Sequence, residues 1–254
     1  MQAPGQTVHG PQFEVISLNM HKGVSALHLR LTAHRLRQRI RDRHPDLVFL
    51  QELQQKTHGR LRDLRVGATL GLTPYLAQDF WPDWHYGRNA LYDRGHHGNA
   101  ILSRHPLSQG LNYDISEYRF ERRGLLHAVA FIGERAVDCF CVHLGLLERG
   151  RRRQLEVVLD CIARIASTGP AIVAGDFNDW RNRAEGPMRE AGFRDVFEIS
   201  TGVPAKTFPA IRPMLRMDRI YVRGLMTHGV ERLSEWSGLS DHLGLSARLS
   251  MPAA

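Results

Sequence analysis

The sequence predicts an α+β fold in which two β-sheets pack face to face and helices cover their outer surfaces. Three observations lead to this prediction. Strand-like apolar segments occur along the whole chain, and amphipathic helical segments interrupt them both early and late. No linker or internal repeat divides the 254 residues. We therefore expect a flexible N-terminal segment over residues 1–11 and a single domain over residues 12–250.

The N-terminal part begins with a predicted strand at Phe13–Asn19. Apolar residues at helical spacing then predict an amphipathic helix over about 28–43, which Pro45 ends. The fully apolar run 47–50 is typical of a buried strand. A second helix is predicted over 61–72. The stripe of the first helix consists of Leu29, Ala33, Leu36 and Ile40.

Strands dominate the centre of the chain, and glycines, prolines and charged pairs separate them, which favours hairpins. An apolar stripe then predicts a helix that Gly169 and Pro170 close. The central strands are predicted at 99–103, 111–117, 125–132 and 137–143, and the later ones at 171–174, 220–222, 230–233 and 243–249. The helical stripe consists of Leu155, Val158, Leu159, Ile162 and Ile165.

The composition is that of an ordinary folded protein, with 43% hydrophobic and 24% charged residues. It excludes collagen-like, coiled-coil and intrinsically disordered chains. No apolar run is long enough for a transmembrane helix, and residues 1–10 do not look like a signal peptide. We expect a cytoplasmic monomer whose three cysteines, Cys139, Cys141 and Cys161, are reduced core residues.

The chain is basic, with 34 Lys plus Arg against 26 Asp plus Glu and a net charge of +8. Only Lys22, Lys56 and Lys206 are lysines. Because the arginine guanidinium matches the geometry of a phosphate, a phosphate-bearing partner is one interpretation. A genome that favours arginine explains the same composition, so charge alone does not decide the partner.

Polar side chains that suit metals and phosphates follow five of the apolar strands. Such groups can converge at one edge of a sheet. Glu52 could bind a hard cation such as Mg²⁺, and Asp176 beside Asn178 suits a water-activating base next to a donor for a phosphoryl oxygen. Taken singly, each segment is also explained as a polar turn. The segments are SLN (17–19), LQE (50–52), VH (142–143), GDFN (175–178) and SDH (240–242).

Other polar patterns are weaker. The arginine run over 149–153 opens a helix, where cations oppose the macrodipole, so either a nearby anion or simple solvation explains it. Adjacent His96 and His97 would point to opposite faces of a strand and make a poor metal pair. The chain has no HExxH, GxxxxGKS/T or CxxC motif, which excludes zinc proteases, P-loop enzymes and zinc ribbons.

Taken together and in order, seven motifs resemble the endonuclease/exonuclease/phosphatase superfamily over about residues 13–249. The resemblance implies a four-layer α/β/β/α sandwich and phosphoester hydrolysis that depends on Mg²⁺ or Mn²⁺. The form VHLGL, followed by Arg153 and Gln154, looks more like the deoxyribonuclease and sphingomyelinase branches than the abasic-site endonucleases. The motifs are SLNMHKG, FLQEL, GNAILSRHPL, CVHLGL, AGDFND, MDRIYV and SDHLGL.

The resemblance also implies which residues hold the metal and activate the water. Glu52 would bind the metal, helped by Asn19 and Asp241. Asp176 would orient or deprotonate the attacking water. The metal and the polar groups would neutralise the charge that develops on the phosphate oxygens.

Further roles concern the phosphate and the leaving group. Asn178 and His143 would contact the scissile phosphate. His242 would stabilise the developing charge or protonate the leaving oxygen, and Asp218 would orient its imidazole. The remaining candidate contacts to the substrate phosphate are Asn99, Arg123 and Arg153.

The function that we expect is therefore a divalent-metal-dependent phosphodiester hydrolase, a nuclease acting on DNA or RNA. The net charge of +8 favours nucleic acid as the partner. The alternative is a phosphodiesterase or phosphatase for a phospholipid or an inositol phosphate, because the same site serves both and a basic surface also suits anionic membranes. A basic binding module without activity is disfavoured, since every acidic and imidazole position is present.

Overall fold

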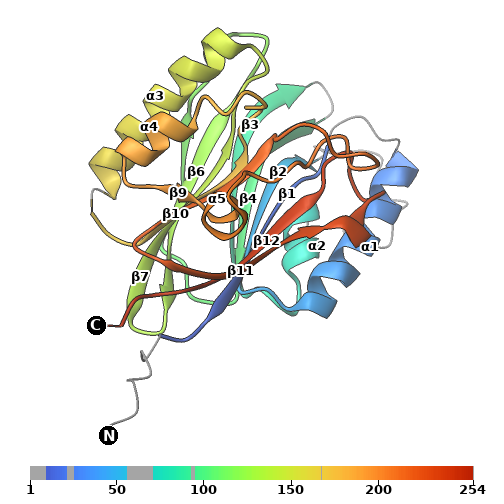
Figure 1. Ribbon diagram of the computed structural model, residues 1–254. Coiled ribbons are helices and arrows are strands. Elements are labelled where there is room, and N and C mark those ends of the chain that lie inside the picture. The colour runs from blue at the N-terminus through green and yellow to red at the C-terminus, as the bar shows by residue number, and fades with distance from the viewer. Residues whose placement is uncertain (1–9, 22–25, 56–70, 93–94, 167, 254) are drawn as a thin grey trace, which may run out of the picture.

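Two six-stranded sheets form the centre of the protein in a computed structural model (Figure 1), which describes residues 10–253 except 22–25, 56–70, 93–94 and 167. In spatial order, the first sheet contains β11 (Met226–Leu233), β12 (Gly244–Ser250), β1 (Phe13–Asn19), β2 (Leu47–Gln55), β4 (Gly95–Ser103) and β3 (Asp83–Tyr92). The second contains β5 (Leu111–Asp114), β6 (Gly124–Ile132), β7 (Arg135–His143), β8 (Ala171–Asp176), β10 (Asp218–Arg223) and β9 (Arg194–Asp195).

Helices cover the outer faces of both sheets (Figure 1). The first sheet carries α1 (Ala26–Arg43) and α2 (Leu72–Ala77), and the second carries α3 (Glu148–Ile165) and α4 (Glu185–Glu190). A short helix, α5 (Val196–Thr201), follows β9. The predicted four-layer α/β/β/α sandwich is confirmed. None of the described helices combines the length and the apolar character that crossing a membrane requires.

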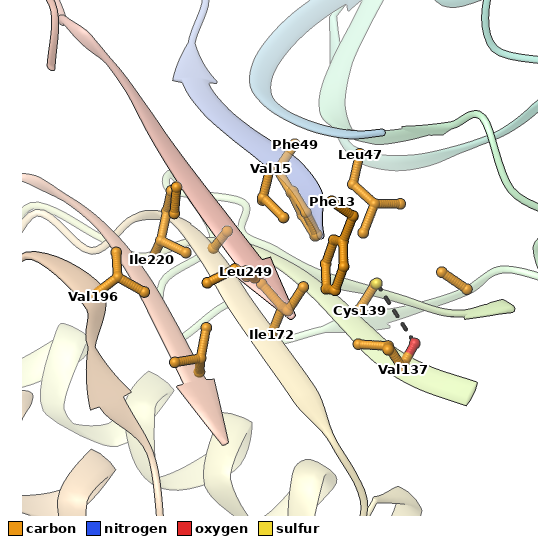
Figure 2. Close-up of a cluster of buried hydrophobic side chains, with 14 of the residues drawn as sticks. Phe13, Val15, Leu47, Phe49, Val137, Cys139, Ile172, Val196, Ile220 and Leu249 are labelled. Carbon is orange, nitrogen blue, oxygen red and sulfur yellow. Dashed lines mark hydrogen bonds between the residues drawn. The ribbon is translucent and has the colours of Figure 1, made fainter. Parts of the chain in front are cut away.

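The main core lies between the two sheets (Figure 2). The first sheet contributes Phe13, Val15 and Phe49, and the second contributes Ile172 and Ile220. Alternate residues of the same strands point outward and pack under the helices, for example Ile16 and Leu18 beneath α1. Because β2 and β8 are buried on both faces, each contains a continuous apolar run in the sequence, at 47–50 and 171–174.

The three cysteines are buried and free, as predicted. Cys139 and Cys141 lie on the same strand, β7, and face the core between the sheets. Burial raises the pKa of the Cys141 thiol to about 12, which keeps it in the unreactive thiol form.

Each sheet contains one β-α-β unit with parallel strands, namely β1-α1-β2 and β7-α3-β8. All the other strand pairs among the described residues are antiparallel. Parallel strands end at the same edge of their sheet, and their antiparallel neighbours begin there. Asp218 at the start of β10 therefore pairs with Asp176 at the end of β8. This topology gathers the polar segments that follow the strands.

The structure differs from the sequence-based prediction at several places. β3 was not predicted, because its mixture of charged, aromatic and small residues (DWHYGRNALY) hides the alternation of an edge strand. The strand predicted over 111–117 ends at Asp114, whose carboxylate accepts a hydrogen bond from the Ser116 nitrogen and turns the chain. The helix predicted over 61–72 lies outside the described residues except at its end, and so does most of the segment 1–11.

Gly175 is the residue that lets β7 and β8 approach each other immediately before Asp176. A Cβ atom at this position would lie 1.9 Å from the carbonyl oxygen of Val142 in β7. Backbone atoms cannot move aside as a flexible side chain can, so a larger residue would push the two strands apart. Gly175 is thus required sterically by the same pairing that brings His143 next to Asp176.

We predict that Gly175→Ala lowers the free energy of unfolding by about 3 kcal/mol, because the added methyl group collides with backbone. Gly186→Ala is the matched control, since a Cβ there meets nothing within 4 Å. It should change stability by no more than about 1 kcal/mol. Urea denaturation of both variants measures the difference, and equal effects would contradict the steric explanation.

Candidate active site

Asp176 is the central residue of the site and is buried. Its Oδ1 accepts a hydrogen bond of 2.8 Å from the backbone nitrogen of Asn178. Its Oδ2 accepts one of 2.8 Å from Nδ2 of Asn19, which ends β1 in the other sheet. The carboxylate therefore lies where the ends of the two sheets meet.

Glu52 reaches the same place because of an irregularity in β2. The pairing of β2 with β4 shifts register between Leu50 and Leu53, and Glu52 has a φ of 55°. A bulge of this kind redirects a side chain. Glu52 Oε1 lies 3.6 Å from Nε2 of His143, and Asp176 Oδ2 lies 3.6 Å from the same nitrogen. His143 at the end of β7 thus lies between the two carboxylates.

Asp218 and His242 form a hydrogen-bonded pair on the other side of Asp176. Nδ1 of His242 lies 2.8 Å from Oδ2 of Asp218, and Nε2 lies 4.0 Å from Oδ2 of Asp176. The carboxylate of Asp218 fixes the imidazole orientation and leaves Nε2 directed toward Asp176. One ligand atom from each of these three residues lies within 4.8 Å of the others.

Burial and mutual proximity shift the titration of this group. Burial, together with the charge of Asp218, raises the pKa of Asp176 to about 7. Burial by itself would lower the pKa of His242, but the carboxylates of Asp218, Asp176 and Asp241 raise it to about 10. The site therefore holds an imidazolium among buried carboxyl groups at neutral pH.

Two other predicted residues lie at the margin of the site. Asn178 has a φ of 50° and donates from Nδ2 to the carbonyl oxygen of Leu144 at 2.9 Å. Asp241 is partly exposed, and its Oδ2 lies 3.1 Å from Nδ1 of His21. The side chain of Asp241 thus faces the rim of the site, although its charge acts on His242.

The three predicted phosphate contacts differ in their positions. Arg123 is buried beside the site and donates from Nε to Leu144 O, the oxygen that also accepts from Asn178. Asn99 lies between the sheets and donates to the carbonyl oxygens of Gly124 and Cys141. Arg153 is exposed on α3 and pairs with Glu117. Only Arg123 of these three adjoins the catalytic candidates through a shared hydrogen-bond partner.

Arg219 is buried, and no role was expected for it from the sequence. Its Nη1 donates to the carbonyl oxygens of Arg216 and Asp218, and its Nη2 donates to that of Asp179. It holds the segment after β8 against the start of β10, and so positions Asp218. The available signal was an arginine directly after Asp218 in an otherwise apolar strand.

The donor set fits a divalent cation. Asp218 Oδ1 is buried and has no hydrogen-bond partner among the described residues. Burial and, after it, the charge of Asp218 raise the pKa of Asp176, and a nearby cation would offset both by stabilising the ionised carboxylate. Carboxylate and amide oxygens are the groups that Mg²⁺ and Mn²⁺ prefer.

Known proteins resemble this chain in sequence over most of its length. The sequence profile of the endonuclease/exonuclease/phosphatase family matches residues 16–242. The uncharacterized protein YbhP of Escherichia coli K12 is 38% identical over 244 residues, which cover 94% of this chain and 96% of that protein. The YbhP protein of Shigella flexneri shows the same identity and coverage.

Solved structures share the fold at lower sequence identity. An endonuclease/exonuclease/phosphatase from Beutenbergia cavernae has a TM-score of 0.72 at 21% identity, covering 96% of this chain and 72% of its own. D. rerio TDP2 in complex with a single-strand DNA product has a TM-score of 0.69 at 21% identity, covering 94% of this chain and 98% of its own. Both show the same sandwich fold.

The pKa of His242 leads to a prediction about pH and stability in the presence of a chelator. Because the folded-state pKa is raised from 6.5 to about 10, the charged imidazole stabilises the protein fully below pH 6.5 and loses that effect as the pH rises toward 10. Asp176 acts in a lower pH range: its pKa is raised from 3.8 to about 7, so the stability that its protonated form contributes is lost as the pH rises from about 3.8 to about 7.

The stability difference between the wild type and His242→Gln should therefore be largest below pH 6.5 and shrink as the pH rises toward 10. Urea denaturation at a series of pH values measures it. A difference that stays constant over this range would show that the imidazole charge is not what the surrounding carboxylates stabilise.

Proposed function

Since the chain belongs to the endonuclease/exonuclease/phosphatase family, whose members hydrolyse phosphoester bonds, we propose that it is a divalent-metal-dependent phosphodiester hydrolase acting on nucleic acid. The observation that carries the proposal is the hydrogen-bonded carboxylate of Asp176. It lies between the Glu52–His143 contact on one side and the Asp218–His242 pair on the other. In this arrangement a base, an acid and metal ligands would adjoin a single position.

Glu52, with Asn19 and Asp241, would hold Mg²⁺ or Mn²⁺. Ligand atoms of Asp176, Asp218 and His242 lie within 4.8 Å of one another, and the two carboxylates would add to the negative charge around the ion. When bound, the ion supplies positive charge to the phosphate oxygens. Asn19 donates to Asp176 through Nδ2, so it would link the metal ligands to the base.

The remaining groups handle protons and phosphate oxygens. Asp176 would orient the attacking water and accept its proton. His242 is protonated at neutral pH and presents Nε2 to the site, so it would stabilise the developing charge or donate a proton to the leaving oxygen. His143, Asn178 and Arg123 would donate to the phosphate oxygens.

Nucleic acid is the substrate that the charge supports. The net charge is +8, and almost all of the positively charged residues are arginines. Neutralisation of phosphates by such residues drives nonspecific binding to nucleic acid. The structural neighbour D. rerio TDP2 was solved with a single-strand DNA product. A substrate panel that includes sphingomyelin and inositol phosphates tests the proposal, because much faster turnover of those compounds would identify a lipid or small-molecule phosphoesterase.

We predict that the wild type nicks plasmid DNA with Mg²⁺ or Mn²⁺ and that a chelator abolishes the reaction. Asp176→Asn and His242→Ala should each lower the rate by about 10²- to 10⁴-fold, because each removes a proton-transfer group. Asp160→Asn changes an exposed carboxylate on α3 and is the matched control. Absence of metal-dependent cleavage of any DNA or RNA form would refute nuclease activity.

Metal binding can be measured without turnover. Mn²⁺ should raise the melting temperature of the wild type, since a ligand that binds only the folded state stabilises it. Glu52→Gln should reduce this shift, while Asp160→Asn should retain it in full. An undiminished shift in Glu52→Gln would remove Glu52 from the metal site.

A further inference from the structure

An exposed aromatic pair lies in the turn between β5 and β6. The rings of Tyr118 and Phe120 stack nearly parallel, with centroids 5.2 Å apart and planes 8° apart. Phe120 is 79% exposed. Burial of a phenylalanine side chain stabilises a protein by about 1.5–3 kcal/mol. The exposed ring of Phe120 does not provide most of this stabilisation. Tyr118 covers one side of the Phe120 ring, and most of the rest of that ring is open to solvent.

The pair is held in place by the neighbouring elements. Tyr118 packs over Gly150 of α3, where an added Cβ would lie 2.5 Å from its Cε2. The Glu121 nitrogen donates to Tyr118 O at 3.1 Å and closes the turn. Glu121 Oε1 in turn accepts from the Leu146 nitrogen at 3.0 Å and from Arg123 Nη2 at 3.1 Å. The aromatic pair is thus presented on an ordered turn.

This turn is joined to the candidate active site through one carbonyl group. Leu144 O accepts from Arg123 Nε at 3.1 Å and from Asn178 Nδ2 at 2.9 Å. The nitrogen of Leu144 donates to the carbonyl oxygen of Asp176 at 2.9 Å. The turn that carries the aromatic pair is therefore hydrogen-bonded, through Arg123 and Leu144, to the segment that holds Asp176 and Asn178.

The turn itself and the segment before Gly150 also carry exposed apolar and basic side chains. Leu146 and Leu147 are 57% and 51% exposed. Arg119 and Arg149 are also exposed and form no ion pair with any residue that the structure describes. We call this region the stacking surface; it consists of Tyr118, Phe120, Leu146, Leu147, Arg119 and Arg149.

We propose that the stacking surface binds the bases of a single-stranded nucleic-acid segment next to the scissile phosphate, an inference that rests on the proposed function. A base placed on the open face of Phe120 would extend the existing ring stack, and the two arginines would meet the backbone phosphates. In a duplex the faces of the bases are already stacked on each other, so a single strand fits the surface better.

Fluorescence anisotropy of a labelled oligothymidylate, measured in chelator so that it is not cleaved, tests the proposal. Phe120→Ala should weaken binding about 5- to 100-fold, as the loss of a stacked base does. Phe120→Trp should bind at least as tightly as the wild type. Phe131→Ala is the matched control, because Phe131 is 42% exposed near the opposite end of the β6–β7 hairpin, and it should bind like the wild type.

Three results would overturn the proposal. The first is that Phe120→Ala and Phe131→Ala change the affinity for the oligonucleotide equally. The second is that the wild type binds a duplex of the same length as tightly as the single strand. The third is that sedimentation with phosphatidylserine vesicles depends on Phe120 while oligonucleotide binding does not. Hydrolysis of bis(p-nitrophenyl) phosphate with Mn²⁺ separates this failure from that of the proposed function. Turnover of this ester without any role of Phe120 in DNA binding refutes the stacking surface alone, whereas no turnover of any phosphodiester refutes the proposed function.

Discussion

The hydrogen bond from Asn19 to Asp176 connects the two halves of this protein at its chemical centre. Each residue ends a parallel strand of a different sheet. The bond can form only if the two sheets pack with these strand ends facing each other. The core between the sheets, which includes Val15, Phe49 and Ile172, determines that packing. Stability of the sandwich and geometry of the site thus depend on the same contacts.

The site concentrates negative charge in a buried position. Asp176 and Asp218 face each other across paired strands, and a fold selected only for stability would avoid that arrangement. Two features limit its cost in the protein alone: hydrogen bonds from Asn19 and Asn178 to Asp176, and the imidazolium of His242. A divalent ion bound as proposed would offset the remaining negative charge.

The two sheets contribute different kinds of residues to the site. The first sheet contributes Glu52 through the bulge in β2, together with Asn19. The second contributes Asp176, the proposed base, and the residues around Leu144, to which the turn that carries the stacking surface is hydrogen-bonded. Arg219 supports this second side from within, because its guanidinium holds the segment after β8 to the start of β10. The position of Asp218 therefore depends on a buried guanidinium that bonds to three backbone carbonyl groups.

The sequence alone determined the sandwich and most of its strands, because doubly buried strands are continuous apolar runs and amphipathic helices show their stripes. It also indicated the catalytic candidates, since polar residues at strand ends occur in a recognisable order. It did not determine β3, whose edge position weakens the apolar pattern, or the bulge that turns Glu52 inward.

Which of the candidate residues lie close together depends on the tertiary structure. Asp176, His143 and Glu52 converge across two sheets, while Asn99 and Arg153 find other partners. Local patterns show which face of an element is buried, but contacts between residues more than a hundred positions apart depend on sheet packing and register. The pairing of Asn19 with Asp176 is such a contact.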